Sequence, residues 1–183
     1  PEMASLNTNT MNFGIVDRKT GEVMIDYVFD NTFTMLQDFG KAMEKNGVKP
    51  EIEVYDIGGL DNVLIIMKQG FFSKPMNFNF VWGVAGGQKF RPEAFTTLFN
   101  ALPPGSNFTT CGVGNDEFPA IMQSCLMGGH MRVGLEDNVR IPSGELAKGS
   151  YELVEWAVRV AEILGREVAT PDEARSIMGF KNR

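Results

Sequence analysis

Residues 51–56 read Glu51-Ile52-Glu53-Val54-Tyr55-Asp56, and this short stretch gives the strongest indication of the fold. Successive side chains of a β-strand point to opposite faces, so one face holds Glu51, Glu53 and Tyr55 and the other holds Ile52 and Val54. Two further segments alternate in the same way: Asn77 and Asn79 lie opposite Phe78 and Phe80, and Arg132, Gly134 and Glu136 lie opposite Met131, Val133 and Leu135. Several strands therefore present one polar and one apolar face.

Strand-like and helix-like segments alternate on both sides of this stretch. Strands are predicted at 2–6, 51–56, 76–82, 107–113 and 130–135, and residues 13–29 are predicted to form an added hairpin that turns at 19–21. Apolar residues at helical spacing predict a helix capped by Asn31 or Thr32, then helices at 59–68, from Pro92 to 102, at 116–127, at 151–164 after a Ser150 cap, and after the capping box of Thr170. Alternating β and α segments predict a parallel sheet.

Two architectures contain such a sheet, an open doubly wound sheet and a closed barrel. Strands of an open sheet that is covered on both faces read as continuous apolar runs. A polar strand face instead suits the inside of a barrel, and an apolar face suits contact with the outer helices. The strand faces therefore favour the barrel, and without a linker or repeat we expect residues 1–183 to form a single domain.

Composition narrows the classes of function. The 183 residues are 43% hydrophobic and 22% charged, which is typical of a folded globular protein. A net charge of −6 argues against nucleic-acid binding, and no apolar run reaches the roughly 20 residues that span a membrane. Cys111 and Cys125 are too few for a disulfide framework and are predicted to be buried fillers. Few cysteines and no export signal predict a cytoplasmic protein.

Residues 130–138, His-Met-Arg-Val-Gly-Leu-Glu-Asp-Asn, are the first candidate site. Glu136 and Asp137 fall at the carboxyl end of a predicted strand, where barrel enzymes place catalytic groups. Glu53 points inward from another strand, and Arg132 is the cation that such a buried carboxylate needs. A Glu–Arg–Asp chain would hold Asp137 and tune its pKa. Ion pairs that only join strand ends explain these residues equally well, so both interpretations stay open.

Two loops give weaker signals. Thr10 and Asn12 follow the first predicted strand, where short polar side chains can hydrogen-bond a small substrate, although they also form ordinary turns. Residues 83–87, Gly-Val-Ala-Gly-Gly, separate a strand from a helix, so the amides of Gly86 and Gly87 are candidates to meet a phosphate. The stretch lacks the full dinucleotide motif, and a plain loop is the favoured interpretation.

Taken together, these segments resemble the β-keto acid cleavage enzyme family. The resemblance covers essentially the whole chain, and its most specific motif is Arg-Val-Gly-Leu-Glu-Asp-Asn at 132–138. Further matching segments lie at 1–6, 10–14, 48–56, 83–87, 102–106 and 161–171. The resemblance implies an α/β fold, a TIM (β/α)8 barrel of which this chain holds about the last five βα units.

The resemblance also implies an activity, typified by 3-keto-5-aminohexanoate cleavage in lysine fermentation. Family members bind one Zn²⁺ ion and exchange acyl groups, so that a β-keto acid and acetyl-CoA give acetoacetate and a new acyl-CoA. By position, the implied roles are zinc ligand for Glu136, general base for Asp137, supporting relay for Arg132 and Glu53, and substrate binding for Thr10 and Asn12. The expected partners are a small β-keto acid, a CoA thioester and further copies of the chain in a dimer or tetramer.

One feature of the family is missing. Its other two zinc ligands form a His-x-His pair near the end of an early strand, and the lone His130 stands elsewhere. Five strands of eight therefore suggest roughly the C-terminal two-thirds of a family member. Two alternatives stay open: another zinc-dependent barrel lyase such as an aldolase, which would not depend on CoA, and an inactive truncated barrel fragment without bound metal.

Overall fold

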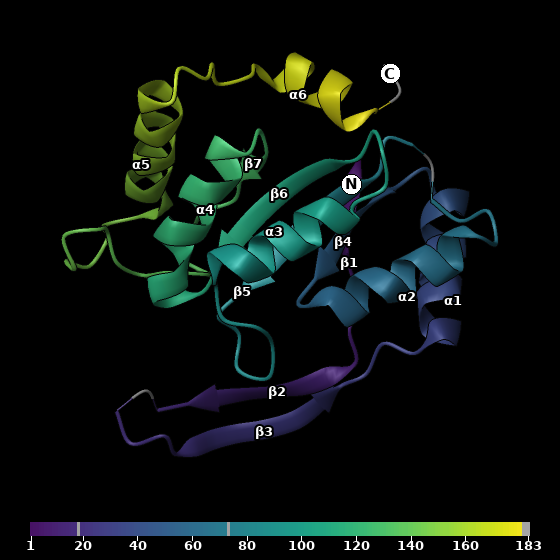
Figure 1. The fold of residues 1–183 in the computed structure, drawn as a ribbon, viewed down its shortest axis with the longest axis horizontal. Helices are drawn as coiled ribbons and strands as arrows, with labels where there is room; N and C mark the ends of the chain where they lie inside the picture. Colours follow the sequence, from purple (N-terminus) through teal and green to yellow (C-terminus); the bar gives the residue numbers. More distant parts are fainter. Residues whose placement is uncertain (18, 73, 181–183) are drawn as a thin grey trace.

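A computed structural model describes residues 1–17, 19–72 and 74–180 (Figure 1). One parallel sheet of five strands has the order β1-β4-β5-β6-β7. These strands are β1 (Met3–Asn7), β4 (Lys49–Val54), β5 (Asn77–Trp82), β6 (Asn107–Gly112) and β7 (His130–Met131). Their order in space follows their order in the chain, with a helix between successive strands. Consecutive units of a (β/α)8 barrel have this topology.

The helices are α1 (Phe33–Lys45), α2 (Ile57–Met67), α3 (Pro92–Ala101), α4 (Glu117–Leu126), α5 (Ser150–Ile163) and α6 (Pro171–Met178), with a 3₁₀ turn at Gly114–Asp116. The predicted capping box of Thr170 is confirmed. Thr32 rather than Asn31 caps α1, and Asp56 caps α2, which begins two residues before the predicted start at 59. The predicted Ser150 cap is wrong, because Gly149 precedes the helix and the Ser150 hydroxyl accepts a hydrogen bond from the Leu135 amide.

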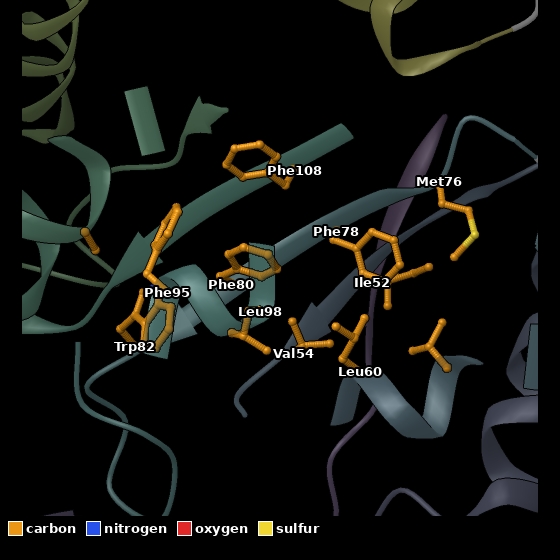
Figure 2. Close-up of a cluster of buried hydrophobic side chains, with 12 residues drawn as sticks. Ile52, Val54, Leu60, Met76, Phe78, Phe80, Trp82, Phe95, Leu98 and Phe108 are labelled. Atoms are coloured by element: carbon orange, nitrogen blue, oxygen red, sulfur yellow. The ribbon is translucent and has the colours of Figure 1, made fainter. Parts of the chain in front are cut away.

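Apolar side chains on one face of the sheet pack against the crossover helices (Figure 2). The cluster joins Phe78, Phe80 and Trp82 of β5 to Phe95 of α3, and all four are fully buried. The Phe80 and Phe95 rings meet edge to face, with centroids 5.6 Å apart. Burial of aromatic side chains dominates core energetics, so this layer fixes the helices against the sheet.

The opposite face of the sheet is polar. Register partners in a parallel sheet point to the same side, and Asn7, Glu53, Asn79, Thr109 and His130 occupy one such row across the five strands. Asn79 is fully buried, and neither its amide nitrogen nor its amide oxygen has a hydrogen-bond partner among the described residues. The predicted alternation of faces is confirmed, with the polar side chains where a barrel has its interior.

The last strand is shorter than predicted. Strand pairing covers only residues 130 and 131, whereas alternation predicted a strand to 135. The Arg132 amide still donates to the Thr110 carbonyl, but the amides of Asp137 and Asn138 both turn back to the Gly134 carbonyl, each at 3.0 Å. This turn at 134–138 ends the strand. It brings Asp137 back toward Arg132 instead of carrying it further along the strand direction.

Two additions lie at opposite ends of the sheet (Figure 1). The predicted hairpin is confirmed as β2 (Met11–Val16) and β3 (Val23–Phe29), and it follows β1 at the carboxyl ends of the strands. At the other end, Asn77 and Asn107 donate from β5 and β6 to carbonyls of α6. Among the described residues, no helix is both long and apolar enough to cross a membrane.

Candidate active site

Arg132 lies at the centre of a cluster of carboxylates. Its Nε lies 3.2 Å from Oδ2 of Asp137, and its Nη2 donates to Oδ1 of the same carboxylate at 3.2 Å. Its Nη1 donates to Oε1 of Glu53 at 3.1 Å, from β4 across the polar face. Glu136 comes within 3.5 Å of Nη2. The two-point contact with Asp137 fixes both the position and the orientation of that carboxylate.

The surroundings raise the pKa of both carboxyl groups that Arg132 holds. Burial raises the pKa of Asp137 above its usual value, and the Arg132 charge offsets only part of that effect. Burial likewise raises the pKa of Glu53 against the opposing charge of Arg132. A carboxylate with a raised pKa is a stronger base than a free one, so Asp137 combines fixed geometry with increased basicity.

Tyr55 adds a contact that sequence reasoning missed. Its hydroxyl donates to Oε2 of Glu53 at 3.2 Å, so both oxygens of Glu53 are occupied, one by Tyr55 and one by Arg132. The signal was present, because alternation already placed Tyr55 and Glu53 on one strand face. The result is a hydrogen-bonded series from Tyr55 through Glu53 and Arg132 to Asp137.

Glu136 has a different environment from its neighbour Asp137. Its side chain is 85% exposed at the carboxyl end of the sheet, whereas that of Asp137 is 7% exposed. No group of three His, Cys, Asp or Glu side chains among the described residues is placed to hold a metal ion. A catalytic zinc site takes about three protein ligands. The described residues therefore do not fit zinc by themselves, and Glu136 supplies at most one ligand.

Thr10 and Asn12 lie at the carboxyl end of β1, where the hairpin begins. Both are exposed. The Thr10 hydroxyl accepts a hydrogen bond from the Asn31 amide at 2.8 Å, which joins the two ends of the hairpin. Binding of a substrate by Thr10 and Asn12 stays a prediction.

The glycine loop at 83–87 packs against the hairpin. Gly86 has a φ of +95°, and a Cβ there would lie 1.7 Å from the Asn12 carbonyl oxygen. The Gly87 amide donates to the Val84 carbonyl at 3.0 Å. Close backbone packing therefore explains why position 86 is a glycine. Contact of this loop with CoA stays a prediction.

The remaining titratable candidates lie apart from the Arg132 cluster or are inert. His130 starts β7, at the end of the strand away from the turn at 134–138. Cys111 and Cys125 are free and buried, as expected, and burial raises the pKa of the Cys111 thiol. Of the residues singled out from the sequence, the structure brings together Arg132, Glu53, Asp137 and Glu136.

A family model described as beta-keto acid cleavage enzyme matches residues 1–180. The chain belongs to the β-keto acid cleavage enzyme family. It is 47% identical over 181 residues to a 3-keto-5-aminohexanoate cleavage enzyme of Fusobacterium nucleatum, covering 99% of this chain and 62% of the relative. It is 33% identical to a 3-dehydrocarnitine:acetyl-CoA trimethylamine transferase of Rhizobium meliloti, covering 100% of this chain and 58% of that protein.

Solved structures support the same fold. The apo structure of ObcA superimposes on 98% of this chain and 44% of its own, with a TM-score of 0.73 and 20% identity. This family member therefore has the fold of part of a TIM barrel and spans about three fifths of the length of the curated relatives it matches.

Proposed function

We propose that the intact protein exchanges acyl groups between a β-keto acid and acetyl-CoA, giving acetoacetate and a new acyl-CoA. The observation that carries the proposal is the buried Asp137 carboxylate, which Arg132 contacts through two nitrogens at the carboxyl end of the sheet. Family membership supports it, as does the name of the Rhizobium relative, which acts with acetyl-CoA. The Fusobacterium relative suggests 3-keto-5-aminohexanoate as the keto acid.

The stoichiometry of this exchange defines what a base must do. The CH2–COO⁻ unit of the β-keto acid leaves its own acyl group and becomes bonded to the acetyl carbonyl carbon of acetyl-CoA, while the original acyl group goes to the CoA sulfur. The methylene carbon must lose a proton before it can form that bond, and it must regain a proton when the CoA thiolate takes the original acyl group and the carbon–carbon bond to that group breaks. Asp137 is the proposed base, since a fixed carboxylate with a raised pKa accepts a proton more readily.

Arg132 and Glu53 have supporting roles in this proposal. Arg132 holds Asp137 at a defined position, and Glu53 holds Arg132 from the opposite side. Positioning of this kind lowers the barrier by fixing the reacting groups before the reaction begins. Thr10 and Asn12 are the proposed contacts for the keto acid, and the loop that contains Gly86 and Gly87 is the proposed contact for CoA.

Zinc belongs to the proposal as a metal that the described residues do not hold by themselves. We propose Glu136 as one ligand, with the others supplied from outside the described residues, since no group of three ligands occurs within them. A bound zinc ion would polarise a carbonyl oxygen of the substrate.

Acetoacetate production by the intact protein tests the function. Protein, Zn²⁺, acetyl-CoA and a panel of β-keto acids are mixed, and acetoacetate and acyl-CoA are measured. We expect both products in equal amounts, and only when acetyl-CoA is present. Cleavage without acetyl-CoA would instead identify a lyase, and no acetoacetate across a broad panel would refute the exchange reaction.

A further inference from the structure

Helix α4 begins with a buried carboxyl group that the proposed chemistry does not use. Glu117 is fully buried, and none of the ion pairs among the described residues includes it. Burial raises the pKa of Glu117 to about 7, although hydrogen bonds from Asn138 and Gly134 act in the opposite direction. Burying a carboxyl group without a cation is costly, so this position calls for a specific explanation.

The partners of Glu117 supply that explanation, because they are the first and last residues of the turn at 134–138. Its Oε2 accepts a hydrogen bond from Nδ2 of Asn138 at 2.8 Å, and its Oε1 accepts a longer one from the Gly134 amide at 3.4 Å. Asp137 lies between these two contacts. One buried side chain thus holds both ends of the turn that presents the proposed base.

Further hydrogen bonds hold the turn at 134–138 in place. The Gly114 amide, in the 3₁₀ turn before α4, donates to the Asp137 carbonyl at 2.8 Å. The Asn138 side chain accepts from the Arg140 amide and donates to the Arg140 carbonyl, so its amide group has a fixed orientation toward Glu117. The start of α4 and the turn are therefore linked by backbone and by side chain at once.

We infer that Glu117 is a positioning residue, which fixes the turn at 134–138 from the start of α4 and so sets the place of Asp137 against Arg132. The inference rests on the proposed function for its kinetic consequence, but the turn itself can be observed without any assay of activity. A displacement of a reacting group by about 1 Å can lower the rate by about 100-fold.

The competing explanation is that loss of any buried polar group on α4 lowers stability, and with it activity. Ser124 offers a matched control for this explanation. It lies on the same helix and is also fully buried, and its hydroxyl donates to the His130 carbonyl at 2.6 Å. Ser124→Ala removes a buried hydrogen bond between α4 and β7 but leaves the turn at 134–138 untouched.

The experiment compares Glu117→Ala, Glu117→Gln and Ser124→Ala in the intact protein, at a temperature well below each melting point. Amide hydrogen exchange of residues 134–138 and steady-state kinetics are measured. Glu117→Ala should speed exchange in the turn and lower kcat by about 10- to 100-fold, with little change in KM for acetyl-CoA. Glu117→Gln should restore part of both, because its amide oxygen can accept from Asn138 while its NH2 group cannot accept from the Gly134 amide. Ser124→Ala should change stability only.

Unchanged exchange at 134–138 in Glu117→Ala would overturn the inference. So would kcat losses in Glu117→Ala and Ser124→Ala that simply follow their losses of stability. If the wild-type protein makes no acetoacetate, the proposed function fails, and the exchange measurement still decides whether Glu117 holds the turn.

Discussion

At the scale of single residues, Asp137 and Glu136 are adjacent in sequence but differ in environment. Asp137 is buried and held at two points by Arg132, whereas Glu136 is exposed and reaches Arg132 at 3.5 Å. A buried, oriented carboxylate suits proton transfer, and an exposed one is accessible to a metal ion. The geometry thus agrees with separate roles for the two neighbours.

Substitution of each neighbour tests this division of roles. Asp137→Asn should lower turnover of the intact protein by about 100-fold or more, because the amide cannot accept the proton, while leaving bound zinc unchanged. Glu136→Gln should lower the zinc content. Acetoacetate assays and metal analysis on both variants measure these effects. Equal loss of zinc from the two variants would contradict separate roles.

The raised pKa of Glu117 predicts how stability depends on pH. The pKa is 4.5 for the ordinary group and about 7 in the folded protein, so the folded state binds the proton more tightly. The contribution of Glu117 is therefore full below pH 4.5 and is lost as pH rises to about 7. The loss is on the order of 3 kcal/mol.

Glu117→Gln, a neutral side chain of nearly the same shape, isolates this effect. Its free energy of unfolding should match that of wild type near about pH 4 and exceed it near about pH 8, with a difference on the order of 3 kcal/mol. Urea unfolding at a series of pH values measures the difference. A difference that does not vary with pH would show that Glu117 has an ordinary pKa in the folded protein.

At the scale of elements, the sequence predicts secondary structure most clearly where the alternation of side chains has to satisfy only the two faces of a single strand. Residues 51–54 satisfy only the two faces of β4, and both faces were predicted, although the strand ends at Val54 rather than at 56 because Asp56 caps α2. Residues 130–138 begin as a strand and end as a turn, and the hydrogen bonds that return to the Gly134 carbonyl come from residues three and four positions later. Alternation extended across that point predicted a longer strand.

The role of Glu117 was missed for a related reason. An acidic residue in the first turn of a helix is explained locally by the helix dipole, so the sequence pattern gives no indication of burial. Its partners Gly134 and Asn138 lie 17 and 21 residues away, and only the packing of α4 against β7 and the following turn brings them together. The contact of Glu53 with Arg132 was predictable because alternation places both side chains on the polar strand face, whereas the turn at 134–138 brings Asp137 to Arg132.

The contact between the glycine loop and the hairpin can be tested by adding one methyl group. Gly86→Ala would place a Cβ against the Asn12 backbone at an unfavourable φ, so the loop or the hairpin must move. We expect the free energy of unfolding to fall by roughly 2–4 kcal/mol, from strain and steric overlap together.

Gly21→Ala is the matched control, because Gly21 also has a positive φ but has nothing within 4 Å of the added atom. It should lose only about 1 kcal/mol. Urea unfolding of both variants measures the contrast, and equal losses would exclude a steric contribution at Gly86.

At the scale of the whole molecule, the five-stranded sheet has the form of part of a barrel. β1 and β7 are its outer strands, so each has one edge without a pairing strand among the described residues. A closed barrel has no free edges, and its interior row is complete only when every strand contributes. The buried, unpartnered amide group of Asn79 faces this interior. The polar face therefore has hydrogen-bonding capacity that the described residues do not satisfy.

The zinc proposal belongs to this scale, because it concerns what residues 1–183 hold alone. With no group of three ligands among the described residues, a polypeptide of residues 1–183 should retain less than about 0.1 zinc per chain after dialysis, while the intact protein should retain about one. Mass spectrometry of metal content measures both, and Glu136→Gln in the intact protein is the control for a site that includes this chain.

One zinc per chain in the polypeptide of residues 1–183 would contradict the proposal, since the metal would then be bound by groups that the structure keeps apart. A zinc content that falls in the intact protein on Glu136→Gln, together with none in the polypeptide, would mean that the site requires Glu136 and ligands from beyond the described residues.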